Sequence, residues 1–370
     1  MPSFVFPPSP AAFDFRSDTV TTPTPAMVAA MTAASFGDDV FREDTTTQTL
    51  ESRVSSMLSH QVGLFVASGT MGNQLALRAH LLQPPHSVLC DARAHIAQYE
   101  AGGVASLSQA MLQRVAPRNG RYLTVEDVKR EIVLGDDIHS APTRVISLEN
   151  TLGGVIMPLE EMRRISEFAK KHGIKLHLDG ARLWNVAAAG AGTLGEYGAL
   201  CDSVSICLSK GLGAPIGSIL VGPEEFIRRA RWVRKSIGGG MRQTGLIAAA
   251  ALAAIDEVYP KLLATHAVAK DLGQYFAGLG IGTLLPVDTS MVFLDLEGAG
   301  LRNSWLQAEA AKRGVKFGSG GRIVVHHQID PRAVQALKEA VQEALDLKVK
   351  GVYKIDEEDA EGGYGSLRRL

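Results

Sequence analysis

The stretch that decides the fold is TRVISLENTLGGVIMPLEEMRRISEFAKKHGIKLHLDGA, residues Thr143–Ala181. It begins with an apolar run, TRVISLEN, continues with an amphipathic segment, PLEEMRRISEFAKKHG, and ends with a second apolar run, IKLHLDGA. The two runs are typical of buried strands, and the segment between them has the period of a helix. A strand, a helix and a strand in this order predict two parallel strands joined by a helical crossover.

The same alternation extends on both sides of that unit. Before it, VGLFVASGT leads into MGNQLALRAHLL, and SVLCD follows; after it come CDSVSICL and APIGSILVG. We therefore expect an α/β fold with a mostly parallel sheet that helices cover on both faces.

The alternation ends near Ala250, where a long Ala-rich helical segment begins that we expect to split near Pro260. The short strands SMVFLDL and GRIVVHHQ and a final helix, PRAVQALKEAVQEALDLKV, follow. This pattern predicts a smaller C-terminal α+β domain. The expected divisions are a lead-in (1–12), a large domain (13–255), a small domain (256–352) and a disordered tail (353–370).

Composition excludes several classes of protein. Lys and Arg number 38 against 39 Asp and Glu, which gives no electrostatic basis for binding nucleic acid or an anionic membrane. The longest apolar run, 245–255, is too short to span a bilayer, and the first residues lack the basic region of a secretory signal. The odd number of cysteines (Cys90, Cys201 and Cys207) and the absence of a CxxC pair favour reduced thiols in a cytoplasmic protein.

The first strand end that carries residues able to bind a ligand is VASGTMGNQ, where Ser68, Gly69 and Thr70 precede a helix. Free N–H groups at a helix start, beside small and hydroxyl residues, can hold a phosphate. The alternative is a plain turn with Thr70 as the helix N-cap. The stretch contains neither GxGxxG nor GK[ST], so it is not a Rossmann or Walker loop.

The second strand end is KLHLDGARLW, which places Asp179 before two small residues. An ionised carboxylate there needs a cationic partner. Arg182 is one candidate, and a protonated pyridine nitrogen of a cofactor is the other. A structural Asp–Arg pair or a helix cap is the alternative interpretation.

The third is Lys210, the one charge in SVSICLSKGLGAPIGSILVG. Burial favours the neutral amine of a lysine, which can then attack a carbonyl. The alternative is an exposed lysine in a turn.

Together the three strand ends match the needs of pyridoxal 5'-phosphate, which uses a phosphate site, a carboxylate for its ring nitrogen and a lysine for its aldehyde. His95, in DARAHIAQYEAGG, supplies a ring that can stack on the cofactor. We expect no metal site, because the pairs His172/His177 and His326/His327 lack a carboxylate in register.

These motifs resemble one known family. FDFRSDTVTTPTPAM, GDDVFRED, LFVASGTMGNQLAL, HIAQYEAGG, SLENTLGGVIMP, HLDGARLWNVA, CLSKGLGAPIGSILVG and GGGMRQTG occur in the order found in low-specificity L-threonine aldolases. The resemblance covers roughly residues 13–328. It implies the PLP-dependent transferase fold of type I, with a large domain of the seven-stranded type and a smaller C-terminal domain.

The resemblance also implies roles for residues. Lys210 would form the Schiff base with the cofactor, Asp179 would pair with its ring nitrogen, and His95 would stack on its ring and serve in acid–base catalysis. Ser68, Gly69 and Thr70 would hold the phosphate.

On the substrate side, the resemblance implies that Ser17, Arg182 and Arg322 bind the α-carboxylate of an amino acid, with Arg182 also in the cofactor site. Lys235 and Arg242 would lie near the site, contributed by a neighbouring subunit. Family members form dimers or tetramers with sites at the dimer interface.

Two positions depart from the family pattern. Leu152 stands where many bacterial members have a histidine, and Phe41 stands where a tyrosine is common. Both changes remove polar groups from the side of the substrate's β-carbon.

We therefore expect a carbon–carbon lyase that cleaves L-threonine, L-allo-threonine and related β-hydroxy-α-amino acids to glycine and an aldehyde. Leu152 keeps a second interpretation open, an alanine racemase of the same family. A remote third is a Ser–Lys hydrolase around Ser209 and Lys210, or a binding protein.

Overall fold

The computed structural model describes residues 9–353. In this part of the chain a seven-stranded sheet has the order β1-β7-β6-β5-β4-β2-β3. Its strands are β1 (Val62–Val66), β2 (Ser87–Asp91), β3 (Met111–Val115), β4 (Thr143–Glu149), β5 (Lys175–Asp179), β6 (Ser203–Cys207) and β7 (Ser218–Gly222). Only β7 runs against the other six, so the predicted mostly parallel sheet is confirmed.

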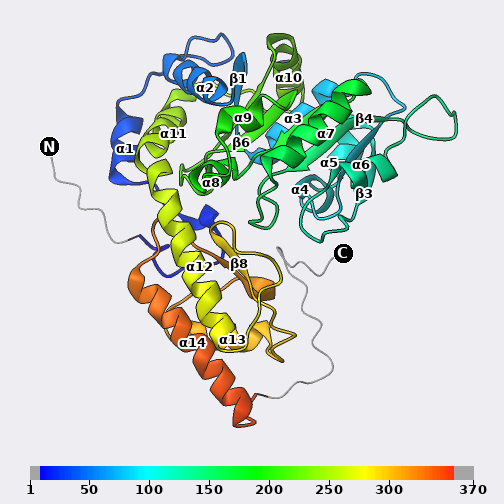
Figure 1. The fold of residues 1–370 in the computed structure, drawn as a ribbon. Coiled ribbons are helices and arrows are strands. Elements are labelled where there is room, and N and C mark those ends of the chain that lie inside the picture. Colours follow the sequence, from blue (N-terminus) through cyan, green and yellow to red (C-terminus); the bar gives the residue numbers. More distant parts are fainter. Residues whose placement is uncertain (1–8, 354–370) are drawn as a thin grey trace.

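Helices surround this sheet and continue into a second, smaller part of the molecule (Figure 1). They are α1 (Pro25–Thr32), α2 (Thr45–Met57), α3 (Gly69–His80), α4 (His95–Gln98), α5 (Gly103–Ser108), α6 (Val125–Glu131), α7 (Leu159–Lys171), α8 (Leu183–Ala188), α9 (Leu194–Gly198), α10 (Glu224–Ser236), α11 (Gly245–Glu257), α12 (Leu262–Gly278), α13 (Asn303–Ala311) and α14 (Pro331–Val349).

The strand–helix–strand unit predicted within residues 143–181 is confirmed. Helix α7 connects β4 to β5 and buries Met162, Ile165 and Ala169, which recur every three or four residues on one face. The two strands pair in parallel and end together, with Glu149 opposite Asp179. The carboxyl ends of neighbouring strands therefore meet at one edge of the sheet, where ligands bind in folds of this kind.

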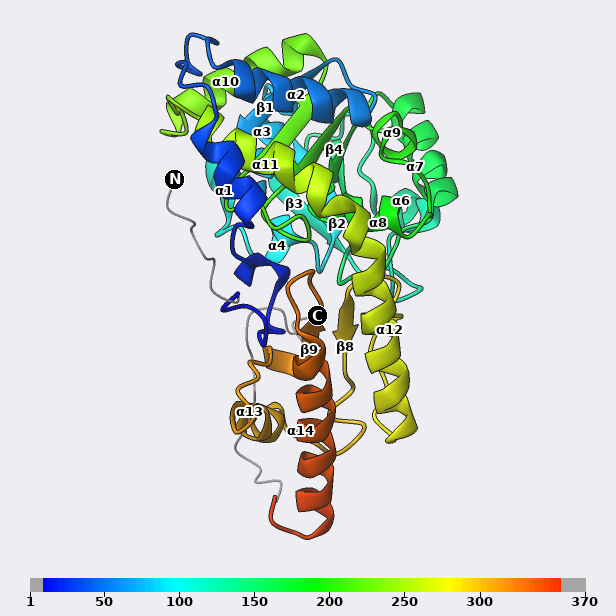
Figure 2. The ribbon, with the colours of Figure 1, turned by 90° about the vertical axis from the view of Figure 1, so that its left-hand side faces the viewer.

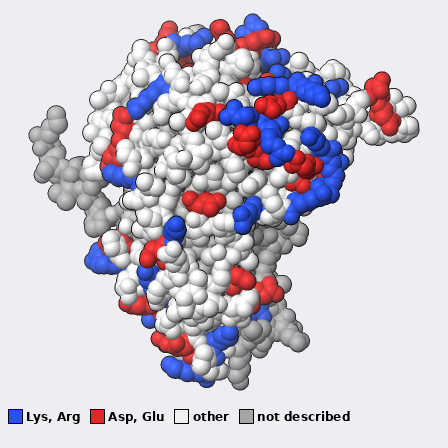
Figure 3. Space-filling model, in the orientation of Figure 1, with Lys and Arg blue, Asp and Glu red and all other residues white. Residues whose placement is uncertain are grey.

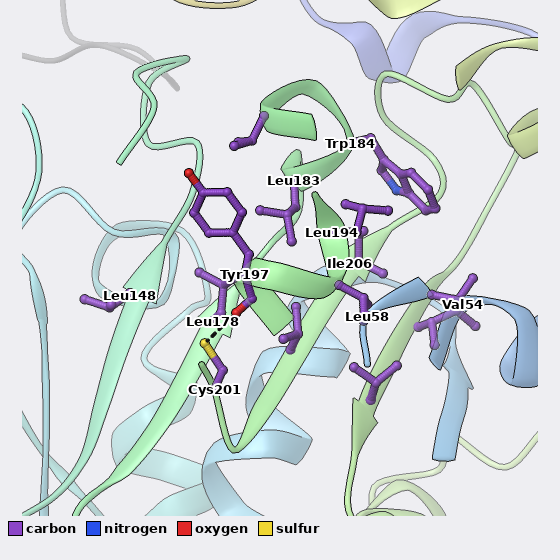
Figure 4. Close-up of a cluster of buried hydrophobic side chains, with 14 of the residues drawn as sticks. Val54, Leu58, Leu148, Leu178, Leu183, Trp184, Leu194, Tyr197, Cys201 and Ile206 are labelled. Atoms are coloured by element: carbon purple, nitrogen blue, oxygen red, sulfur yellow. Dashed lines mark hydrogen bonds between the residues drawn. The ribbon is translucent and has the colours of Figure 1, made fainter. Parts of the chain in front are cut away.

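The main apolar core lies between the sheet and its helices. Figure 4 shows a portion of it, where Leu178 of β5, Ile206 of β6 and Trp184 of α8 gather. Burial of this much apolar surface is the dominant favourable contribution to folding.

A second core fills the small lobe, which we define as β8 (Met291–Phe293), β9 (Arg322–Val324), α13, α14 and the C-terminal half of α12. The chain reaches it along α12, which runs from one core to the other (Figures 1 and 2). The expected break near Pro260 is confirmed, because a short 3₁₀ helix at Tyr259–Lys261 separates α11 from α12.

The N-terminal segment also belongs partly to the small lobe. Phe15 is fully buried in the second core, and its N–H and carbonyl bond to Lys316 and Val324. Asp14 forms a parallel bridge with Lys316. The domain limits at 13, 255 and 352 stay predictions, while most of the lead-in and all but one residue of the expected disordered tail lie outside the described residues.

On the face shown in Figure 3, positive and negative side chains are interspersed, as the balanced composition predicts. Within residues 9–353, no helix is both long enough and apolar enough to cross a bilayer.

Candidate active site

A cavity of about 470 Å³ lies between the sheet edge and the small lobe. Its wall includes five residues predicted from the sequence: Ser17, His95, Arg182, Lys210 and Arg322. They come from segments far apart in the chain. The fold thus brings together the residues expected to hold a cofactor's aldehyde and a substrate's carboxylate.

Lys210 follows β6 in a tight turn, in which the Gly213 N–H donates to its carbonyl at 2.7 Å. The side chain is partly exposed and lines the cavity. Its Nζ makes no hydrogen bond or ion pair within residues 9–353. The sequence left open whether Lys210 is buried or lies in an exposed turn. In the structure it does neither fully: its amine is partly exposed and lies at the cavity wall.

Asp179, the last residue of β5, is 4% exposed. Its Oδ1 accepts a hydrogen bond from the Ala181 N–H at 3.0 Å, and its Oδ2 accepts one from Asn73 Nδ2 at 2.7 Å. Within the described chain, Asp179 forms no ion pair with a lysine or an arginine. A buried carboxylate with neutral donors only suits a ligand that brings a positive charge, such as a protonated pyridine.

Arg182, one of the two candidate partners of Asp179, pairs with another residue. Its Nε and Nη2 donate to the two oxygens of Asp18, at 2.9 and 2.6 Å. Burial opposes ionisation of Asp18, but the charge of Arg182, aided by Lys210 and Arg322, lowers its pKa. The pairing of Arg182 with Asp179 is therefore wrong, and Asp18 fixes the guanidinium that lines the cavity.

His95 begins helix α4 and is held at two points. Its Nδ1 lies 2.7 Å from Glu100 Oε1, and its backbone N–H donates to Glu149 Oε2, also at 2.7 Å. Burial alone would lower the pKa of His95, but the hydrogen bond to Glu100 and the charges of Asp179 and Glu149 together raise it above the ordinary value.

Glu149, at the end of β4, is a site residue that was not predicted from the sequence. It lines the cavity and lies opposite Asp179 on the neighbouring strand. Burial, followed by the negative charge of Asp179, raises the pKa of Glu149 to about 8. Glu149 is therefore easier to protonate than an ordinary glutamate, and it lies next to Asp179 at the edge of the sheet.

The expected phosphate site lies at the start of α3. Ser68, and not Thr70, is the N-cap, and its Oγ accepts from the Met71 N–H. The N–H groups of Gly69 and Thr70 donate no hydrogen bond within residues 9–353. A Cβ on Gly69 would lie 2.7 Å from the Cys207 Sγ, so the turn is tight against β6. Two free N–H groups at a helix start fit a phosphate.

Four further predicted positions lie outside the cavity wall. Lys235 and Arg242 flank a glycine-rich loop that approaches the start of α3, because a Cβ on Gly239 would lie 2.8 Å from the Met71 side chain. Phe41 is 70% exposed. Leu152 lines a separate small cavity that it shares with Glu149.

The sequence interpretation missed Asp18, Asn73, Glu100 and Glu149. Glu149 ends a strand, which is the same signal that singled out Asp179. Asn73 and Glu100 are buried polar residues 27 positions apart in the chain, and no local pattern indicates that their side chains meet.

Comparison with known proteins gives consistent results. The family model described as beta-eliminating lyase matches residues 14–299. Aldolase vrtJ of Penicillium aethiopicum is 53% identical over 91% of this chain and 87% of its own. The low-specificity L-threonine aldolase of Candida albicans is 50% identical over 93% and 92%, and alanine racemase TOXG of Cochliobolus carbonum is 44% identical over 91% and 89%.

Solved structures share the fold. A threonine aldolase of Leishmania major superposes with a TM-score of 0.75 at 19% identity, covering 90% of this chain and 99% of its own. Serine palmitoyltransferase of Sphingomonas wittichii superposes with a TM-score of 0.70 at 18% identity, covering 92% and 88%. The expected type I fold, with a seven-stranded sheet and a small C-terminal part, is confirmed.

Proposed function

The chain belongs to the beta-eliminating lyase family, and from this premise we propose that it is a PLP-dependent aldolase. Its substrates are L-threonine, L-allo-threonine and related β-hydroxy-α-amino acids, which it cleaves to glycine and an aldehyde. Relatives named as low-specificity L-threonine aldolases, at 47–50% identity over at least 90% of this chain, support this activity. The observation that carries the proposal is a single cavity wall with Lys210, His95 and Arg182.

The family is PLP-dependent, and the donor groups of this chain fit that cofactor. Lys210 would hold it covalently, and the buried carboxylate of Asp179 would receive its ring nitrogen. The free N–H groups of Gly69 and Thr70, with the Ser68 cap, would hold its phosphate. When bound, the cofactor supplies an electron sink for the bond that breaks at the substrate's α-carbon.

The protein's own residues orient the substrate and move its protons. Arg182, whose Nε and Nη2 are fixed by Asp18, lines the cavity, and with Arg322 and Ser17 it would bind the α-carboxylate. His95 would accept the proton of the β-hydroxyl group as the Cα–Cβ bond breaks. Arg322 of β9 and Phe317, which packs in the core of the small lobe, also line the cavity.

Alanine racemisation is the second candidate. The relative TOXG carries that name at 44% identity, and Leu152 stands where the family resemblance expects a polar histidine. A racemase needs proton carriers on both faces of the α-carbon and no β-hydroxyl group. The same cavity offers His95 and Lys210 for those roles.

One assay separates the two. Purified protein with PLP is incubated with L-threonine, L-allo-threonine and L-alanine, and the products are acetaldehyde, glycine and D-alanine. We expect acetaldehyde and glycine in equal amounts and no D-alanine. D-alanine without acetaldehyde would establish the racemase instead.

A protein that is colourless, with no borohydride-sensitive absorbance before or after adding PLP, would contradict both candidates. That result would revive the hydrolase or binding-protein interpretation.

We also propose a homo-oligomer, a dimer or tetramer, with the site at the dimer interface. The Asp39 N–H bonds to the Arg242 carbonyl, so two segments with exposed apolar residues adjoin: Phe36 and Phe41 on one, Ile237 on the other. Such surface is typical of subunit contacts. A cytoplasmic location is consistent with three buried free cysteines.

A further inference from the structure

The carboxylate of Glu100 is buried at the centre of a hydrogen-bond network, and its side chain is 0% exposed. Oε1 accepts from Asn73 Nδ2 at 2.8 Å and lies 2.7 Å from His95 Nδ1, while Oε2 accepts from Gln74 Nε2 at 2.5 Å. Three partners on two oxygens are the environment of an ionised carboxylate, which only accepts hydrogen bonds. The proton between Glu100 and His95 therefore belongs to Nδ1.

Asn73 joins this carboxylate to the one expected to pair with the cofactor. Its Nδ2 also donates to Asp179 Oδ2 at 2.7 Å, so both amide hydrogens are used on carboxylates. The Oδ1 of Asn73 lies 3.1 Å from His177 Nε2, and His177 Nδ1 lies 2.9 Å from Ser203 Oγ. Burial lowers the pKa of His177 to about 4, so this ring is neutral and donates through Nε2. His177 therefore donates to Asn73, and Asn73 donates to both Glu100 and Asp179.

We propose that Glu100 is a positioning residue that keeps the His95 proton on Nδ1 and leaves Nε2 free to accept a proton during cleavage. The inference rests on the proposed aldol cleavage. Nε2 makes no hydrogen bond within residues 9–353, and the ring lines the cavity. Asn73 holds Glu100 and Asp179 together, so the base and the cofactor-binding carboxylate keep a fixed relation. One ring nitrogen of His95 and one carboxylate oxygen each of Glu100 and Asp179 all lie within 4.8 Å of one another.

The proton step balances as follows. The O–H bond of the substrate's β-hydroxyl group breaks and an N–H bond forms at Nε2. The Cα–Cβ electron pair moves to the α-carbon side, and the former hydroxyl carbon leaves as an aldehyde. The imidazolium releases its proton as the α-carbon of glycine takes one up, so the protein gains no net proton. Glu100 stabilises the imidazolium, as the carboxylate partner of a catalytic histidine does.

Other charged groups also face His95. Asp179 and Glu149 are negative or titratable neighbours, and Lys210 and Arg182 lie in the same cavity wall. A general pH effect on activity would therefore not identify Glu100. The test must remove this one charge and follow His95 itself.

The variant Glu100→Gln does this with little change in shape. Gln74 Oε1 has no hydrogen-bond partner, so after rotation of that amide it can accept from the new Nε2. The other oxygen still accepts from Asn73 and His95. We therefore expect the variant to fold.

The decisive measurement is the pH titration of the His95 ring proton on Cε1 by NMR, assigned with His95→Asn, in the holoenzyme and again without cofactor. In Glu100→Gln the midpoint should fall by about one pH unit or more, because a charge in contact with the ring has been removed. For L-threonine, kcat should fall about tenfold or more and KM should change little.

The control is Glu51→Gln. Glu51 is another buried carboxylate, bonded to Arg231 and to the Phe65 N–H and not part of the cavity wall. It should leave the His95 midpoint unchanged. If Glu100→Gln does not fold, Glu100→Asp serves instead, because it keeps the charge but moves it away from His95 by one methylene. The His95 midpoint should then fall below the wild-type value, by less than is expected for Glu100→Gln.

An unchanged His95 midpoint in a folded Glu100 variant would overturn the inference. Its failure is distinct from that of the proposed function: if the wild-type protein does not cleave threonine, the aldolase proposal fails, whereas the titration still reports whether Glu100 controls His95.

Discussion

The guanidinium of Arg182 is fixed by two parallel hydrogen bonds to the carboxylate of Asp18, a residue 164 positions earlier in the chain. Both side chains are largely buried. Asp18 lies on the N-terminal segment whose Phe15 packs in the core of the small lobe. The arginine expected to bind substrate is therefore oriented by a segment that also connects the two parts of the molecule.

Replacing Asp18 should weaken both folding and substrate binding. Asp18→Asn leaves a buried guanidinium without its counter-charge, so the free energy of unfolding should fall by about 3 kcal/mol. Because Arg182 loses its orientation, KM for L-threonine should rise about tenfold. Denaturant unfolding and steady-state kinetics measure the two effects. Asp91→Asn is the matched control, because Asp91 accepts the same two hydrogen bonds from a largely buried arginine, Arg93, and neither residue lines the cavity; an equal rise in KM there would contradict the role of Asp18.

Asp179 should matter far more for rate than for folding. In Asp179→Asn the amide oxygen can accept from only one of Asn73 and Ala181 and the amide nitrogen faces the other donor, so we expect a modest fall in melting temperature in a folded protein. The charge that would stabilise a protonated cofactor ring is lost, and kcat should fall ~100-fold or more. Activity near the wild-type level in this variant would contradict the assignment of Asp179.

The tight turn at Gly69 should be needed for cofactor binding. In Gly69→Ala the added Cβ would meet the Cys207 Sγ at 2.7 Å. Either the Cys207 side chain or the start of α3 must then move, and PLP should bind about tenfold more weakly, as expected for overpacking. Gly278→Ala is the control: this residue lies in α12 with nothing within 4 Å of a new Cβ. Fluorescence titration with PLP compares the two, and equal affinities would contradict the proposed phosphate site.

The fold could be predicted largely from local pattern. The alternation of short apolar runs with the amphipathic segment that became α7 predicted parallel strands, and the Pro260 break separated α11 from α12. The packing of Phe15 with the small lobe could not be predicted, because it depends on contacts with Lys316 and Val324, some 300 positions away. No periodicity within one segment carries such information.

The site residues, too, could be predicted from the sequence only in part. Asp179 ends β5 and Lys210 lies in the turn that follows β6, so the rule that ligands bind at the carboxyl ends of strands found them. The same rule applied to β4 would have found Glu149. Asn73 and Glu100 act through side-chain hydrogen bonds between α3 and the segment after α4. Only the three-dimensional arrangement shows why two polar side chains are buried there.

Glu149 should make the stability of the apoenzyme depend on pH. Burial raises its pKa to about 8, above the value of an unfolded glutamate. A raised carboxyl pKa contributes stability that is complete below the unfolded pKa and is lost as pH rises through the folded pKa. The contribution should therefore decline between about pH 4.5 and about pH 8. The lowered pKa of Asp18 acts only at lower pH, outside this window.

The variant Glu149→Gln isolates this contribution, because its amide oxygen can still accept from the His95 N–H and it carries no charge at any pH. Relative to wild type, its free energy of unfolding should rise by about 1 kcal/mol or more between about pH 5.5 and about pH 8.5. The raised pKa of His95 also makes wild-type stability fall as pH rises. Because the charge of Glu149 contributes to that raised pKa, the variant loses this part as well, and the loss adds to the same difference. Denaturant unfolding at fixed protomer concentration measures the difference. Glu160→Gln, at an exposed position on α7, should show no such trend; a pH-independent difference for Glu149→Gln would mean that Glu149 is ionised in the folded apoenzyme.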